Sequence, residues 1–341
     1  MEMSEMVPSF TRIGEGAVPM VALWRGEILE SLHHGHAVVA RDTGEIVEVW
    51  GRADTLIYPR SSCKMIQALP LLETGVGRDL TPAHLALACA SHQGAAIHVA
   101  RVARWLSDLG LGERDLRCGC QEPQDIPERD RLIRDGETPC QLHNNCSGKH
   151  AGFLMLNQHL GGDADYVRPD HPVQRAVRTA FEDVTAMPSP GFGIDGCAAP
   201  NFSTELTALA QAAARFAGAS DSGDGRARAM ARLRDAMRAH PDLVAGEHRA
   251  CTDLMRALDG RAAIKTGAEG VFVAILPEQR IGIALKIVDG AMRAADAAIT
   301  ALLIRHRGLD PAHPVVARYL GPIRNRQGAI VGATRAAEGF A

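Results

Sequence analysis

A serine and a lysine stand three residues apart in the segment YPRSSCK, at Ser61 and Lys64. Residues at this spacing share one face of a helix, so the hydroxyl and the amine can meet. A neutral amine can take the proton of a serine and make it a nucleophile. A lysine is neutral at pH 7 only where burial or a second cation lowers its pKa. A helix-capping serine beside a surface lysine would show the same pattern, and Ser62 fits less well because its spacing points it away from Lys64.

A second lysine belongs to the tripeptide Lys265-Thr266-Gly267, which ends a predicted strand far downstream. Serine β-lactamases and penicillin-binding proteins pair Ser-x-x-Lys with Lys-Thr-Gly on a strand beside the nucleophile. The order of segments agrees as well, because a helical region separates the two motifs here too. The agreement of motif with position favours Ser61 as a nucleophile over Ser61 as a structural serine.

Two further segments, HNNCSGKHAG (143–152) and GIDGCAAP (193–200), combine thiols with other polar groups. Cys146, Lys149 and His150 lie within one turn, and Asp195 and Cys197 alternate across a segment expected to be extended. Thiolates are good zinc ligands, and three protein ligands with one open position are typical of catalytic zinc. The spacing is not that of a zinc finger, and two buried cysteines beside a helix-capping loop would explain the same residues.

The remaining candidates are weaker. Cys118 and Cys120 are separated by one residue, which is awkward for a shared tetrahedral ion, so we interpret them as structural. Ser91 and His92, in the loop ACASHQGA, could face a cleft. Three cysteines on apolar helical stretches are expected in the core: Cys63, Cys89 and Cys251.

The elements that must position these residues follow from the hydrophobic pattern. Strands are expected at about 19–58 and 261–289, with hairpin turns at 42–44 and 277–279. Mainly helical periodicity covers about 61–258, with Ser61 or Ser62 as a helix N-cap and a long loop region at 118–152, and a C-terminal helix covers about 291–307. The predicted fold is therefore α/β (α+β) in a single catalytic domain, 1–341. Its antiparallel sheet joins the two ends of the chain, helices flank the sheet, and a helical insertion lies beside it.

The composition restricts the classes of partner. Of 341 residues, 46% are hydrophobic, which is enough for a large core, and the net charge of −3 comes from interspersed signs. No basic stripe indicates a nucleic acid partner, and no apolar run has the length of a membrane span. The N-terminal residues do not resemble a signal peptide, so we expect a cytoplasmic protein with reduced cysteines.

Taken together, these motifs resemble one family. The segments that carry the resemblance are YPRSSCKMIQALPL, LACASHQG, HNNCSGKHAGFL, HPVQ, GIDGCAAPNF and KTGAEGVFVAI with GIALKIVDG. They are similar to the Rhizobium-type L-asparaginases, also called the asparaginase II family, from about residue 20 to residue 335. The resemblance implies a serine β-lactamase-like fold, a homodimer, and hydrolysis of L-asparagine to L-aspartate and ammonia.

The resemblance also implies roles for individual residues. It implies two Ser–Lys pairs, Ser61 with Lys64 and Ser91 with Lys265. It implies zinc, with Asp195 holding the metal's water, and Arg60 and His150 close to substrate and metal. The implied zinc ligands are Cys146, Lys149 and Cys197. In the resulting hypothesis, Ser61 attacks the side-chain amide, and Lys64, kept partly neutral by burial and by Lys265, removes its proton.

Two positions depart from the family pattern, and two alternatives stay open. Ala95 stands where related sequences usually carry Glu, and Met65 where they usually carry Pro. One alternative is a zinc hydrolase in which metal-bound water attacks and Ser61 only binds substrate. The other is a non-catalytic descendant of the fold that binds an amino acid or senses penicillin.

Overall fold

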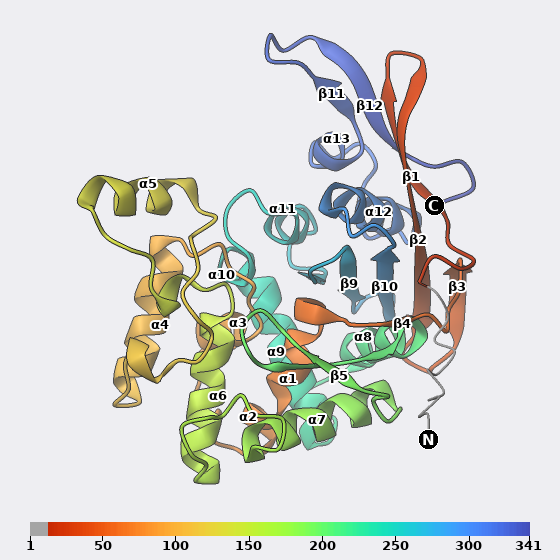
Figure 1. The fold of residues 1–341 in the computed structure, drawn as a ribbon. Coiled ribbons are helices and arrows are strands. Elements are labelled where there is room, and N and C mark those ends of the chain that lie inside the picture. Colours follow the sequence, from red (N-terminus) through yellow and green to blue (C-terminus); the bar gives the residue numbers. More distant parts are fainter. Residues whose placement is uncertain (1–12) are drawn as a thin grey trace, which may run out of the picture.

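A computed structural model describes residues 13–341. Their largest single element is a curved antiparallel sheet, with helices packed on it and beside it (Figure 1). The sheet has eight strands in the order β11-β12-β1-β2-β10-β9-β8, and β3 pairs with β2. Their bounds are Val18–Arg25 (β1), Ile28–Arg41 (β2), Ile46–Trp50 (β3), Ala263–Thr266 (β8), Val271–Leu276 (β9), Ile281–Ile287 (β10), Pro322–Arg324 (β11) and Ile330–Ala336 (β12). Strand β8, which ends on Lys265 and Thr266, lies at one edge.

The centre of the sheet is covered by helices, which explains its composition. Every residue of β9 and β10 is buried, as expected for short, continuously apolar strands. Helices α8 (Leu206–Gly218) and α12 (Met292–Arg305) both pack against these two strands. The contact with α8 is so close that a Cβ on Gly282 would lie 2.1 Å from the backbone nitrogen of Ala214. Glycine is therefore required at that position.

The other helices that lie between β3 and β8 in the sequence form a second body beside the sheet (Figure 1). They are α1 (Lys64–Gln67), α2 (Leu69–Glu73), α3 (Pro82–Ala88), α4 (Ala96–Asp108), α5 (Ile126–Asp135), α6 (Ser147–Leu160), α7 (Pro172–Thr185), α9 (Gly225–Ala239), α10 (Pro241–Val244) and α11 (Ala250–Ala257), whereas α13 (Val316–Tyr319) follows α12. Three 3₁₀ turns are η1 (Arg60–Cys63), η2 (Glu113–Asp115) and η3 (Gln141–His143). Four short strands complete the set, as β4 (Leu56–Ile57) pairs with β7 (Thr204–Glu205), and β5 (Phe192–Ile194) with β6 (Pro200–Phe202).

The expected architecture is confirmed in outline. Strands from the two ends of the chain share one sheet through the β2–β10 pairing, and both expected hairpins, β2–β3 and β9–β10, are present. Within the part of the chain that the structure describes, no helix has the length and apolarity needed to cross a membrane.

Three local expectations were wrong. The strands β11 and β12 were not expected, because β11 has only three residues and the half-exposed, Gly- and Ala-containing sequence of β12 has no clear alternation. Pairing of β12 with β1, and of β11 with β12, defines them. The segment 118–152 is not one long loop, since it contains the polar helix α5 and the start of α6. Neither Ser61 nor Ser62 caps a helix, because both lie inside η1, whose N-cap is Pro59.

Helix caps give a direct test of local stability. Ala95 is the N-cap of the 13-residue helix α4 and offers no side-chain acceptor to its first turn. Ala95→Ser should raise the free energy of unfolding by about 0.5–2 kcal/mol, since a hydroxyl would accept an orphan N–H. Urea denaturation measures this change.

The reciprocal substitution is the control. Asp224 caps α9 and accepts from the backbone nitrogen of Ala227 at 2.8 Å. Asp224→Ala should lower the free energy of unfolding by a similar amount, about 1 kcal/mol. A loss at Asp224 without any gain at Ala95 would show that the cap of α4 is already satisfied by another group.

Candidate active site

One Ser–Lys pair is joined directly at the edge of the sheet. The amine of Lys265, on β8, donates to the Ser91 hydroxyl at 2.8 Å and to the backbone oxygen of Thr266 at 2.8 Å. The Ser91 backbone is held from the helical side, because its N–H donates to the Val244 oxygen at 2.8 Å. Burial, followed by the positive charge of Lys64, lowers the pKa of Lys265 to about 7. A lysine with this pKa is partly neutral at pH 7 and can accept a proton.

The other expected pair is not hydrogen-bonded. The buried amine of Lys64 donates to the Ala90 oxygen at 2.5 Å and to the Cys146 sulfur at 3.1 Å. No hydrogen bond joins Lys64 to Ser61 in residues 13–341. Ser61 is half-buried on η1, whereas neighbouring Ser62 is buried and donates to the Pro59 oxygen at 2.7 Å. Ser61 is therefore the more accessible hydroxyl of the two.

Arg60 begins this turn in a conformation that non-glycine residues rarely adopt. Its φ is +52°, and such backbone strain is concentrated at functional sites. Its guanidinium donates to one oxygen of Asp195 at 2.8 and 3.2 Å. Burial opposes ionisation of Asp195, but the bond from Arg60 and the charge of Lys149 hold its pKa below the usual value.

The thiols expected to bind zinc lie beside the Ser–Lys groups. Cys146 precedes α6, and Lys149, one turn later, donates to the Cys197 sulfur at 3.2 Å. A hydrogen bond from Cys146 holds the pKa of Cys197 well below its usual value, and this bond, together with burial, raises the pKa of Cys146 to about 12. Cys197 is therefore the thiol of the two that ionises more readily.

One expectation about this cluster was wrong. Asp195 and Cys197 do not alternate along a strand, because they lie in the turn between β5 and β6. The Asp195 nitrogen donates to the Ala199 oxygen at 2.9 Å, and Ala198 has a φ of +66°. The turn, and not strand alternation, points both side chains toward Arg60 and Lys149.

The donor set fits zinc in its chemistry. In residues 13–341, no group of three or more His, Cys, Asp or Glu side chains is placed to bind a metal ion. The expected set is of a different kind, because its third member is Lys149. The sulfurs of Cys146 and Cys197, with the Lys149 amine in contact with Cys197, present two soft donors and one nitrogen, which Zn²⁺ accepts.

His150 lies one residue after Lys149 and is held by Tyr166. Nδ1 of His150 is hydrogen-bonded to the Tyr166 hydroxyl at 2.9 Å, and that hydroxyl also accepts from the Arg117 backbone nitrogen at 2.8 Å. Burial holds the pKa of His150 well below its ordinary value, so the ring is neutral at pH 7. Its other nitrogen, Nε2, is buried and has no hydrogen-bond partner in the described chain.

Sequence reasoning missed three supporting residues. Asn144 accepts from the Cys146 backbone nitrogen at 2.8 Å, and Asn145 accepts from the Cys146 sulfur at 3.1 Å. Their position next to Cys146 in HNNCSG was an available signal. Tyr166, which orients His150, had no signal because sixteen residues separate the two. Cys118 is buried and Cys120 exposed, so these two thiols do not face one ion.

Comparison with known proteins identifies a family. A profile of the L-asparaginase II family matches residues 21–336, and no curated protein matches the chain. Similar solved structures include Mglu (15% identity, TM-score 0.46, covering 81% of this chain and 67% of that one). They also include a β-lactamase from Mycobacterium bovis (11%, 0.44, 80% and 94%) and a D-alanine carboxypeptidase from Burkholderia cenocepacia (12%, 0.36, 78% and 93%). Structural similarities this distant support no assignment of activity.

The buried amine at the centre of the site should reduce stability. Unfolded lysine has a pKa of about 10.4, whereas Lys265 has about 7 in the folded chain. Between these values the unfolded state binds more protons, so Lys265 costs stability at and below pH 7, and the cost shrinks as pH rises toward 10. Lys265→Met should therefore raise the free energy of unfolding by about 1–4 kcal/mol at pH 7, and by less at pH 10.

Urea denaturation at both pH values measures this effect. Ser91→Ala is the matched control, because it removes the partner of the amine and keeps the amine itself. It should show no gain that depends on pH in this way. An unchanged or lower stability of Lys265→Met at pH 7 would contradict a pKa lowered by burial.

Proposed function

Because the chain belongs to the L-asparaginase II family, and is therefore an amidohydrolase, we propose that it hydrolyses L-asparagine to L-aspartate and ammonia with Ser61 as nucleophile. One observation carries the serine mechanism, namely a buried lysine with a lowered pKa, Lys265, bonded to a serine and close to a second lysine. Family membership also counts against a non-catalytic amino-acid-binding role.

In the proposed reaction, access decides which serine attacks. Ser61 is half-buried, whereas Ser91 is only 6% exposed and already bonded to Lys265. Ser61 Oγ bonds to the side-chain amide carbon, and its proton passes to Lys64 after that amine leaves one of its present acceptors. The carbon–nitrogen bond then breaks, and the nitrogen leaves as ammonia after protonation. Water hydrolyses the acyl-enzyme, with Ser91 and Lys265 relaying the proton.

Two groups stabilise charge in this scheme. Backbone N–H groups at the start of η1 would hold the oxyanion, as helix starts do. The Arg60–Asp195 ion pair lies at the same turn and would position the charged end of the substrate. The strained φ of Arg60 fixes where its guanidinium stands relative to Ser61.

We propose that Cys146, Lys149 and Cys197 bind zinc, with Asp195 beside them. When bound, the ion would supply positive charge that orients the polar end of the substrate. The contacts that support this site are Lys149 on Cys197 and Lys64 on Cys146. Lys149 would have to bind as the neutral amine, which requires metal binding to displace its proton.

The competing zinc hydrolase, in which Ser61 only binds substrate, also has an observation in its favour. Lys64 donates to Cys146 and not to Ser61, so the base is oriented toward the thiols. The serine hydrolase and the zinc hydrolase are distinguished by whether turnover is lost on removal of the Ser61 hydroxyl or on removal of zinc.

Ser61→Ala should lower the turnover of L-asparagine by at least about 1,000-fold, because removing a nucleophile leaves only binding and charge stabilisation. Ammonia release measures the turnover. Ser62→Ala is the matched control, since its hydroxyl only bonds Pro59, and it should stay within a few-fold of wild type.

Activity of Ser61→Ala within tenfold of wild type would overturn Ser61 as nucleophile. Complete chelation separates the two functions further. A rise in KM alone supports Ser61, whereas loss of turnover with an intact fold supports the zinc hydrolase. The same assay with D-asparagine and L-glutamine defines substrate preference.

We also propose a homodimer in a reducing cytoplasmic compartment. All eight cysteines are free thiols, which supports the compartment. Exposed apolar side chains occur on the two strands that flank β1, where Ile28 of β2 is 74% exposed and Ile330 of β12 is 62% exposed. Figure 1 shows these strands projecting from one end of the sheet, and apolar side chains exposed together mark protein interfaces.

Ile28→Lys combined with Ile330→Lys should convert the dimer into a monomer of 36.4 kDa, because two charges would be buried without partners. Light scattering after size exclusion measures the mass. Ile133→Lys, at a 71% exposed residue of α5, is the control and should remain dimeric. A monomeric wild type would contradict the homodimer, and a dimeric double variant would contradict this interface.

A further inference from the structure

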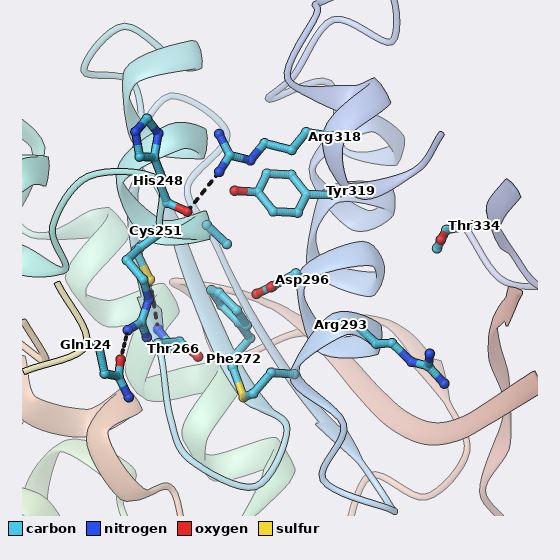
Figure 2. A pocket seen from close by; sticks show the side chains of 13 residues that line it. Gln124, His248, Cys251, Thr266, Phe272, Arg293, Asp296, Arg318, Tyr319 and Thr334 are labelled. Atoms are coloured by element: carbon cyan, nitrogen blue, oxygen red, sulfur yellow. Dashed lines mark hydrogen bonds between the residues drawn. The ribbon is translucent and has the colours of Figure 1, made fainter. Parts of the chain in front are cut away.

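A cavity of ≈ 530 Å³ is lined by Thr266, the residue that follows Lys265 on β8 (Figure 2). Consecutive residues of a strand point to opposite faces, so Lys265 faces Ser91 while Thr266, the next residue of β8, lines the cavity. The other walls come from α11, β9, α12 and α13. The cavity therefore shares β8 with the proposed catalytic groups but is not lined by Ser61, Lys64, Cys146 or Cys197.

Three charged groups that line this cavity have no ion pair in the described chain, namely Arg249, Asp296 and Arg293. The guanidinium of Arg293 donates to His33 and Ser31 and points away from Asp296 in Figure 2, so Arg249 and Asp296 are the two that remain available. Among residues 13–341, Asp296 of α12 has neither an ion pair nor a side-chain hydrogen bond, and Figure 2 shows it pointing into the space between Phe272 and Tyr319. Arg249 bonds the neutral side chain of Gln124 and pairs with no carboxylate in this part of the chain. Burial raises the pKa of Asp296 to about 6.

The neighbouring polar groups are already satisfied. Arg318 pairs with Asp253 at 3.0 Å and donates to the His248 oxygen at 3.0 Å. Tyr319 donates to Asp253 at 2.7 Å. Beside the apolar ring of Phe272, the cavity therefore offers the guanidinium of Arg249 to an anion and the carboxylate of Asp296, which feels the charges of Arg249 and Arg318 but bonds neither, to a cation.

We propose that the cavity binds a zwitterionic α-amino acid, with its carboxylate on Arg249 and its ammonium on Asp296. A zwitterion supplies both missing charges in one small molecule, and a polar ligand with an apolar stem suits a cavity of this size. A simple anion would leave the Asp296 carboxylate uncompensated, and a simple amine would leave Arg249 uncompensated.

A ligand bound in the cavity would also change the protonation of Lys265, and the effect of this change on turnover rests on the proposed function. The charge of Arg249 is one of those that lower the pKa of Lys265. Cys251, in the cavity wall, accepts from the Thr266 nitrogen at 3.2 Å, so the wall holds the strand that carries Lys265. A carboxylate on Arg249 would offset its charge and leave Lys265 more fully protonated. The bound amino acid would then slow turnover.

Calorimetric titration with L-aspartate tests the binding, since this amino acid is not a substrate of the proposed reaction. We expect two sites per chain, one at Ser61 and one in the cavity. Asp296→Asn should weaken the cavity site by at least tenfold, and Arg249→Gln should do the same, while Arg60→Gln should affect only the other site. Glu278→Gln, at an exposed carboxylate of the β9–β10 turn, is the control and should change neither site.

Outcomes for the cavity and for the proposed function are distinguishable. One site that is lost in Asp296→Asn but kept in Arg60→Gln would support the cavity and count against the binding of product at Ser61. Succinate, which lacks the ammonium, should bind the cavity at least tenfold more weakly than L-aspartate. Equal L-aspartate affinity and stoichiometry in wild type and Asp296→Asn, with the variant folded by circular dichroism, would overturn the proposal.

Discussion

The site depends on burying two lysine amines near each other at the edge of the sheet. Each buried ammonium loses its hydration, and each destabilises the charge of the other. The pKa of Lys265 is lowered to about 7, and its amine is hydrogen-bonded to Ser91. The amine of Lys64 is hydrogen-bonded to the Ala90 oxygen and the Cys146 sulfur. The surrounding elements supply these acceptors and bury both amines.

This constraint connects two kinds of chemistry that the motifs suggested separately. Lys64 lies between the serine region and the thiols, because it follows Ser61 by three residues and yet donates to Cys146. Lys64 donates to the Cys146 sulfur and Lys149 to the Cys197 sulfur. In the proposed mechanism, a metal ion on these sulfurs would compete with both lysines. Zinc binding at the thiols and the freedom of Lys64 to act on Ser61 would then be coupled.

The sheet makes this arrangement possible by placing β8 at its edge. An edge strand has one side without a strand partner, and here that side receives Cys251 of α11 and the turn that carries Ser61. Gly267 shows how close the approach is, since a Cβ there would lie 2.5 Å from the Pro59 oxygen. The glycine of Lys-Thr-Gly is thus required by packing, whereas its lysine and threonine serve opposite faces of the strand.

The sequence by itself determined the strand-rich ends, the helical middle, both hairpins and the family, because hydrophobic period, turn residues and long motifs are local properties. It also predicted the serines, lysines and cysteines that lie together here, but not Asn144, Asn145 and Tyr166, which bond Cys146 and His150. Only the tertiary structure decided which partners meet. Spacing of three residues allowed Lys64 to reach Ser61, but acceptors from distant segments, at Ala90 and Cys146, bind its amine instead. Contacts between distant segments also explain why the sequence did not predict β11 and β12, the turn that presents Asp195 and Cys197, or the absence of ion pairs at Asp296 and Arg249 in the described chain. Strand pairing, side-chain burial and the pKa of Lys265 depend on many neighbouring groups at once, and the chain brings these groups together only when it folds.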